Sequence, residues 1–171
     1  MVMNIQNIAY KNKIRYYITS TLLNETLATL RKRGCRQQES IVLWAGKLNE
    51  DSKEAHILTS IVPKKGHWGG GVTLKYSFLL KLNDELHKRE LLLLSQVHTH
   101  PGDFGHSLGD ELNAVSYRLG YISIVVPNFA NYSVSFYDSY FYEYIGNWKW
   151  CLLTKDEVAT RFTVVDSKIR I

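Results

Sequence analysis

Two histidines one residue apart point most directly to chemistry in this sequence: His98-Thr99-His100-Pro101. The short, leucine-rich segment before them, residues 91–97, predicts a strand buried on both faces, and Pro101 ends it. Alternate side chains of a strand point the same way, so the two imidazoles, roughly 6.6 Å apart at Cα, can converge on one metal ion. They can equally be hydrogen-bonded structural residues, so a metal site needs a third ligand.

Asp110 is the candidate third ligand, within Ser107-x-x-Asp110. This pattern is also that of an ordinary helix N-terminus, in which the Ser caps and the Asp bonds back. After a His-x-His strand, however, Asp110 on the first helical turn can reach over the strand end. Two His and one carboxylate leave a fourth position open, which is typical of a catalytic zinc site. Asp103 is an alternative carboxylate in the loop directly after the strand, and we favour Asp110 over it.

A hydrolytic zinc site also needs a base. Zinc-bound water has its pKa lowered to about 7, and its proton is usually received by a carboxylate that is not a ligand. The sequence offers many Glu residues, and spacing alone does not choose among them.

Hydrophobic periodicity predicts the elements that position these residues. The order is that of a mixed α/β domain, a central sheet flanked by helices, and we expect residues 1–171 to form one domain. We expect helices at 20–33 (capped by Ser20), 75–89 and 107–119; strands at 41–48, 55–62, 91–97 and 121–126; further antiparallel strands from Asn131 through Phe136 and between Tyr140 and Trp150; a last strand within 162–171; and a glycine-rich loop at 66–71.

Composition is that of an ordinary globular chain. Of 171 residues, 45% are hydrophobic and 22% charged, which excludes disorder, collagen-like repeats and a coiled coil for the whole. The formal net charge of +5, without a nucleic-acid motif, leads us to expect no nucleic-acid partner. No apolar run approaches the roughly 20 residues of a membrane span, and no signal-like segment opens the chain. With two cysteines, Cys35 and Cys151, we expect a cytoplasmic protein with reduced thiols.

The chemistry-bearing residues resemble the active-site motif of the JAMM/MPN+ zinc metalloproteases. That motif is a distant N-terminal Glu, then His-Ser/Thr-His-Pro, then Ser-x-x-Asp. Residues 98–101 and Ser107-x-x-Asp110 match it in type and order. The family Glu precedes a hydrophobic strand that ends in Gly, and Glu39 stands in that place before residues 40–46. The resemblance covers roughly residues 18–140.

The motif departs from the family pattern in two details. Six residues separate His100 from Ser107, where many members have seven, and bacterial members with a Pro-Gly…His-Ser loop share the shorter form. Glu111 adjoins Asp110, and the Ser-x-x-Asp spacing favours Asp110.

The resemblance implies an MPN-like (cytidine-deaminase-like) fold and a role for each motif residue. His98, His100 and Asp110 would bind Zn²⁺. Glu39 would hold the metal-bound water, act as general base and then protonate the leaving amine. Ser107 would donate a hydrogen bond to the tetrahedral oxyanion, worth a few kcal/mol in comparable sites.

The resemblance also implies a substrate class: an amide or isopeptide bond after the C-terminal tail of a ubiquitin-like protein, held in a groove beside the metal. The short, bare domain resembles bacterial members. Three alternatives stay open: a catalytically silent MPN scaffold in a larger complex, a peptidase that trims a small sulfur-carrier protein, and an unrelated His-x-His hydrolase, which needs a barrel of roughly 250 residues. The sequence leaves the oligomeric state undetermined.

Three further residues have a functional and an ordinary interpretation. His106, beside Ser107, either orients the loop or contacts substrate, or is a solvated loop histidine. His67 and Trp68, in the glycine-rich loop, either form a flap over the substrate tail or belong to a plain loop.

Overall fold

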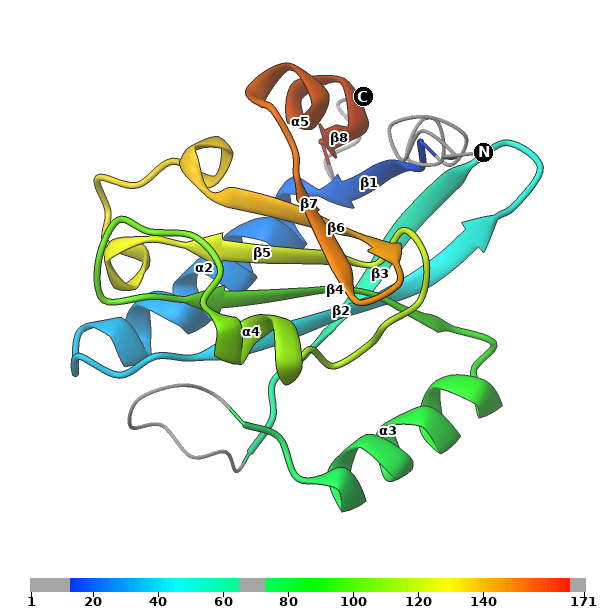
Figure 1. Cartoon of the computed structure of the whole chain (residues 1–171), viewed down its shortest axis with the longest axis horizontal. Coiled ribbons are helices and arrows are strands. Elements are labelled where there is room, and N and C mark those ends of the chain that lie inside the picture. Colours follow the sequence, from blue (N-terminus) through cyan, green and yellow to red (C-terminus); the bar gives the residue numbers. More distant parts are fainter. Residues whose placement is uncertain (1–12, 65–72, 167–171) are drawn as a thin grey trace, which may run out of the picture.

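One mixed α/β architecture organises the part of the chain that the computed structural model describes, residues 13–64 and 73–166. A curled sheet has the strand order β7-β6-β5-β4-β2-β3-β1-β8, and helices flank it (Figure 1). In chain order the elements are β1 (Arg15–Thr19), α2 (Ser20–Gly34), β2 (Ile41–Asn49), β3 (Glu54–Ile61), α3 (Tyr76–Lys88), β4 (Leu92–Thr99), α4 (Leu108–Leu112), β5 (Ile122–Val126), the 3₁₀ turns η2 (Asn128–Ala130) and η3 (Phe136–Asp138), β6 (Tyr140–Gly146), β7 (Lys149–Leu152), α5 (Lys155–Arg161) and β8 (Phe162–Val165).

Strand β4 lies in the middle of the sheet. It pairs in parallel with β5 and antiparallel with β2, and its last six residues are buried. The carboxyl ends of β4 and β5 therefore meet at one edge of the sheet. This is the kind of edge at which ligands bind in open α/β sheets.

Helix α2 covers the face of the sheet away from the histidines, and it runs behind the strands in Figure 1. Its apolar stripe of Leu23, Leu27 and Leu30 is buried in the main core with residues of β1 to β5. Trp44 Nε1 donates to Thr26 Oγ1 at 2.9 Å, which satisfies the indole N–H inside this core. The opposite face of β4 is left for α4 and the candidate site.

Most predicted elements are confirmed. The helices expected at 20–33 and 75–89 and the strands expected at 41–48, 55–62, 91–97 and 121–126 are present with ends shifted by at most two residues. The predicted cap is wrong by one residue: Thr19, still extended at the end of β1, accepts the hydrogen bond from Leu22 N–H at 3.2 Å, so Ser20 is already helical.

The helix predicted at 107–119 is wrong in length, because α4 ends at Leu112. The apolar spacing that suggested a longer helix is no core stripe: Leu108, Leu112 and Leu119 are all at least half exposed. After α4 the backbone turns inward instead, and Val115 N–H donates to the buried Gln96 Oε1 at 2.9 Å.

The strand predicted from Asn131 through Phe136 is also wrong. The side chain of Asn131 accepts hydrogen bonds from the backbone and hydroxyl of Ser133, which forms an Asx turn in place of a strand. Helix α5 was not predicted, although Thr154 and Glu157 form the capping box that marks its start. The antiparallel strands expected between Tyr140 and Trp150 are confirmed as β6 and β7.

Some predictions fall outside the described residues: the loop at 66–71, with His67 and Trp68, and the end of the strand expected within 162–171. Within the described ranges, no helix is both long and apolar enough to cross a membrane.

Candidate metal centre

His98, His100 and Asp110 come together at the end of β4. Each offers one possible ligand atom, and these atoms lie within 4.8 Å of one another. Asp110 Oδ1 lies 3.1 Å from His98 Nε2, and Asp110 Oδ2 lies 3.2 Å from His100 Nε2. Both histidines are buried, whereas the carboxylate remains partly open to solvent. The three predicted ligands thus form one cluster that opens to the surface.

A capping box positions the carboxylate. Ser107 Oγ accepts from Asp110 N–H at 3.3 Å, and Asp110 Oδ2 accepts from Ser107 N–H at 2.7 Å and from its hydroxyl at 2.8 Å. The structural and the metal interpretations of Ser107-x-x-Asp110 therefore coexist, because the same bonds that start α4 fix Asp110 over the strand end.

The donor types suit a small cation such as zinc. One possible ligand atom of each residue lies within 4.8 Å of the others, and imidazole nitrogen and carboxylate oxygen are the atoms that bind zinc at about 2.0–2.1 Å. Asp103, the alternative carboxylate, is exposed and accepts a hydrogen bond from Tyr140 Oη at 3.0 Å, so it lies outside the cluster. The donor set of two imidazoles and one carboxylate leaves a coordination position free.

The electrostatics of the cluster favour a cation. Burial alone would raise the pKa of Asp110, but its contacts with His100 and His98 hold that pKa far below the usual range. Burial opposes protonation of His100, yet the contact with Asp110 and the charge of Glu39 raise its pKa. Because a metal ligand must be a neutral imidazole, protons and a metal ion compete for this negative potential.

Glu39 lies on the same side of the sheet as the two histidines. Ile41 pairs with His98 in the antiparallel β2–β4 register, so two residues further Glu39 stands across from His100. The side chain is half-buried, and its charge is felt by His100. Glu39 therefore acts electrostatically on His100 and does not belong to the three-residue cluster.

His106 is not a solvated loop residue. Its ring stacks on Tyr142 with centroids 3.8 Å apart, lies edge to face with Trp150 at 5.2 Å, and lies 6.2 Å from the ring of His98. Its Nε2 is 2.8 Å from Ser123 Oγ. Burial, and secondarily the charge of His98, lower the pKa of His106 to about 3, so the ring is neutral at physiological pH.

A buried polar network under the site was missed at the level of sequence. Gln96 Nε2 donates to Ser123 Oγ at 3.1 Å, and Ser123 in turn contacts His106. The available signal was the strand alternation that places Gln96 on the same face as His98 and His100.

A left-handed turn supports the backbone of His100. Asn128, Phe129 and Ala130 all have positive φ, between 52° and 55°. Phe129 N–H donates to the His100 carbonyl at 2.8 Å, and Asn128 N–H donates to the Gly102 carbonyl at 3.2 Å. Consecutive non-glycine residues in this conformation are costly and are found mainly where function requires them.

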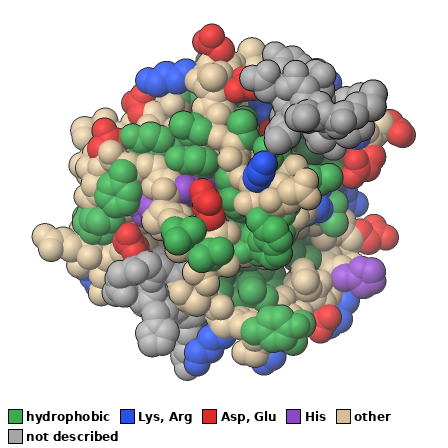
Figure 2. Space-filling view, in the orientation of Figure 1, with side chains coloured by type: hydrophobic (Ala, Val, Ile, Leu, Met, Phe, Trp, Pro, Cys, Tyr) green, Lys and Arg blue, Asp and Glu red, His purple; other side chains and the backbone are tan. Residues whose placement is uncertain are grey.

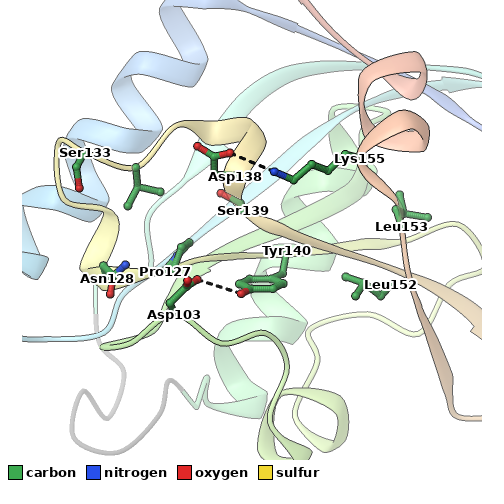
Figure 3. Close-up of a pocket in the computed structure, with 11 residues that line it drawn as sticks. Asp103, Pro127, Asn128, Ser133, Asp138, Ser139, Tyr140, Leu152, Leu153 and Lys155 are labelled. Carbon is green, nitrogen blue, oxygen red and sulfur yellow. Dashed lines mark hydrogen bonds and ion pairs between the residues drawn. The ribbon is translucent and has the colours of Figure 1, made fainter.

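A groove of about 530 Å³ begins beside this loop. Figure 3 shows the Asp103–Tyr140 hydrogen bond on one side of it and the ion pair between Asp138 and Lys155, 3.7 Å long, on another. Leu152 and Leu153 form an apolar part of its lining. The groove is lined in part by Asp103 and Asn128, which belong to the loop after His100 and to the turn that supports it.

The surface around the cluster is rich in hydrophobic side chains. Figure 2 shows histidine atoms and an acidic side chain at the surface with hydrophobic side chains around them. Phe104, in the loop after β4, and Leu108 and Leu112, the first and last residues of α4, are between 48% and 71% exposed. Exposed apolar side chains next to a cluster of this kind are typical of a binding surface.

Comparison with known proteins agrees with this picture. The chain is 37% identical over 107 residues to a Sinorhizobium fredii (strain NBRC 101917 / NGR234) protein named "Probable metalloprotease y4jG". The match covers 60% of this chain and 65% of that protein's length. No protein-family model matches the chain.

A solved structure shares the fold. The solution structure of protein DSY2949 from Desulfitobacterium hafniense matches 89% of this chain and 94% of its own, with a TM-score of 0.64 and 12% identity. At that identity the likeness establishes a shared fold and carries no further argument.

Proposed function

We propose that the chain is a zinc-dependent peptidase of the JAMM/MPN+ type with an MPN-like (cytidine-deaminase-like) fold. The observation that carries the proposal is the convergence of His98, His100 and Asp110 at the end of β4, with Glu39 across from His100. The name of the Sinorhizobium relative, a metalloprotease, supports the same reaction class.

The metal would occupy the cluster of two imidazoles and one carboxylate. When bound there, zinc lowers the pKa of a coordinated water to about 7 and polarises the scissile carbonyl. His98 on β4 and His100 directly after it hold their positions because both are buried, and Asp110 because the capping box fixes it.

The proton transfers fall to Glu39. Its carboxylate is free of the cluster and half-buried, so it can take a proton from the attacking water and deliver it to the leaving amine. Ser107 would stabilise the oxyanion. Its hydroxyl hydrogen is directed at Asp110 Oδ2, so that role requires the hydroxyl to turn toward the substrate.

The substrate we propose is the C-terminal tail of a ubiquitin-like protein, cut at the amide bond that follows it, in the cytoplasm. An extended, small-residue tail can thread past a partly open carboxylate, and the exposed Phe104, Leu108 and Leu112 offer apolar contact for a folded partner. The groove beside Asp103 would take the chain on the far side of the cut bond.

Elemental mass spectrometry of the purified chain and its His100→Ala variant tests the proposal. We expect one zinc per wild-type chain and none in the variant. Zinc-loaded Glu39→Gln should then keep its metal and fail to hydrolyse a ubiquitin-like protein fused through its tail to a reporter peptide. A wild-type chain that takes up no zinc when zinc is supplied, or a Glu39→Gln enzyme as active as wild type, would overturn the proposal.

A further inference from the structure

We propose that His106 is a positioning residue: held as its Nδ1–H tautomer by a buried hydrogen-bond chain from Gln96 through Ser123, it fixes the loop at 101–107 so that Asp110 meets the two histidines. The hydrogen-bond chain is inferred from the distances between its atoms. Its effect on metal binding rests on the proposed function.

The direction of each hydrogen bond follows from one donor that cannot be reversed. Val115 N–H donates to Gln96 Oε1 at 2.9 Å, so the other end of that amide, Nε2, donates to Ser123 Oγ at 3.1 Å. Among the hydrogen bonds of the described residues, Ser123 Oγ has one further partner, His106 Nε2 at 2.8 Å, and we assign the hydroxyl hydrogen of Ser123 to that nitrogen. A neutral imidazole that accepts at Nε2 carries its proton on Nδ1.

The ring and backbone of His106 are held from two further sides. Tyr142 stacks on the ring, and its hydroxyl accepts from His106 N–H at 3.2 Å. The ring of Trp150 packs edge to face against the ring of His106. Gly105 lets the loop lie this close, because a Cβ there would collide with the Tyr142 hydroxyl. Residues of β5, β6 and β7 thus all contact the loop through the side chain of His106.

The position of His106 affects the metal cluster through the next residue in the chain. Ser107 follows His106 directly and forms the capping box that orients Asp110. The His106 ring also packs near that of His98. Residues that orient metal ligands in this way typically change metal affinity or activity by about 10–100-fold when replaced.

The tautomer can be read directly in the metal-free chain by nitrogen-15 NMR of the imidazole rings. We expect His106 to carry its proton on Nδ1 in the wild type and to lose that preference in Ser123→Ala, which removes the donor to Nε2. An Nε2–H tautomer in the wild type, or a tautomer unchanged in Ser123→Ala, would overturn the proposal.

Zinc affinity, measured by competition with a chelator, tests the positioning role. His106→Phe keeps an aromatic ring for Tyr142 but cannot accept from Ser123, and we expect zinc to bind about 10–100-fold more weakly. His106→Gln places an amide oxygen near the former Nε2 and should restore most of the affinity. His56→Phe is the matched control, since His56 stacks on Tyr17, on β1, and should leave affinity unchanged.

Each outcome separates this proposal from the proposed function. Unchanged affinity in His106→Phe, or equal losses in the Phe and Gln variants, would overturn the positioning role while the zinc site stands. A wild-type chain without zinc would overturn the proposed function, and the metal-free NMR comparison would still decide the hydrogen-bond chain. If His106→Phe does not fold, Ser123→Ala carries the same affinity comparison with the loss of a single oxygen.

Discussion

Two hydrogen bonds join Ser40 and Thr99 where β2 begins and β4 ends. Thr99 N–H donates to the Ser40 carbonyl, and Ser40 N–H donates to Thr99 Oγ1, both at 3.0 Å. Both residues are buried. The pair extends the strand pairing beyond Ile41 and His98, and so it places Glu39 beside His100.

Thr99→Val should uncouple the proposed base from the proposed metal site. Valine keeps the branched shape but leaves the buried Ser40 N–H without its acceptor, which costs about 1–3 kcal/mol. We expect urea unfolding to show that loss, zinc content to stay at the wild-type level, and the rate of hydrolysis to fall because Glu39 is less well fixed. Thr99→Ser keeps the hydroxyl and is the matched control. Equal stability of the Val and Ser variants would contradict the assigned role.

The left-handed turn that supports His100 should tolerate glycine. Ala130 has φ of 55°, a conformation that costs an L-residue about 1–2 kcal/mol, and glycine does not pay this penalty. Two losses offset this gain: the greater freedom of glycine in the unfolded chain, about 0.4–1 kcal/mol, and the removal of the buried Ala130 methyl group, about 0.8 kcal/mol. We therefore expect Ala130→Gly to leave the free energy of unfolding within about 0.5 kcal/mol of the wild type in urea unfolding.

The matched control is Ala159→Gly in α5, where the backbone is helical. The same substitution there should destabilise by about 0.5–1 kcal/mol. A near-zero change at the buried Ala130 against a loss at the exposed Ala159 would attribute the difference to backbone conformation. A loss of stability in Ala130→Gly as large as that in Ala159→Gly would show that the turn is not strained.

Sequence reasoning succeeded where one local rule decided the outcome. The apolar stripe of Leu23, Leu27 and Leu30 required a helix, and the two-residue period required His98 and His100 to share a face. It failed after Asp110, because Leu112 and Leu119 keep helical spacing while facing solvent, and periodicity alone does not reveal which apolar face is covered.

The sequence predicted the three clustered residues of the candidate site but did not reveal the hydrogen bonds that support them. His98, His100 and Asp110 follow from a short stretch of chain. The bonds from Gln96 to Ser123 and from Phe129 to the His100 carbonyl join segments that are distant in sequence, and hydrogen bonds between such segments leave no local pattern.

A buried ion pair ties the C-terminal elements to the sheet and should dominate their stability. Arg161 in α5 makes two 2.8 Å hydrogen bonds to the Glu143 carboxylate in β6, and its Nε donates to the Ile14 carbonyl at 3.0 Å. Breaking such a pair by neutralising one partner leaves an uncompensated buried charge. We expect Glu143→Gln to lower the free energy of unfolding by about 3–5 kcal/mol in urea unfolding.

Glu54→Gln is the comparison for that variant. Glu54 pairs at 3.0 Å with Arg15, whose side chain is 52% exposed, and surface pairs contribute about 0–1 kcal/mol. A Glu143→Gln variant no less stable than Glu54→Gln would mean that the buried pair contributes little.

The neutral ring of His106 should make the metal-free fold sensitive to acid. Its pKa is about 3 in the folded protein, against about 6.5 for an unfolded histidine. As pH falls from 7 to 5, this histidine becomes protonated in the unfolded chain but stays neutral in the folded chain. The free energy of unfolding therefore falls by roughly 1–2 kcal/mol. His106→Phe has no such group. In urea unfolding in the presence of a chelator, its free energy of unfolding should therefore fall by roughly 1–2 kcal/mol less between pH 7 and 5 than that of the wild type. Identical losses between pH 7 and 5 in the two proteins would mean that His106 takes up its proton in the fold, which the packing against Tyr142 and Trp150 argues against.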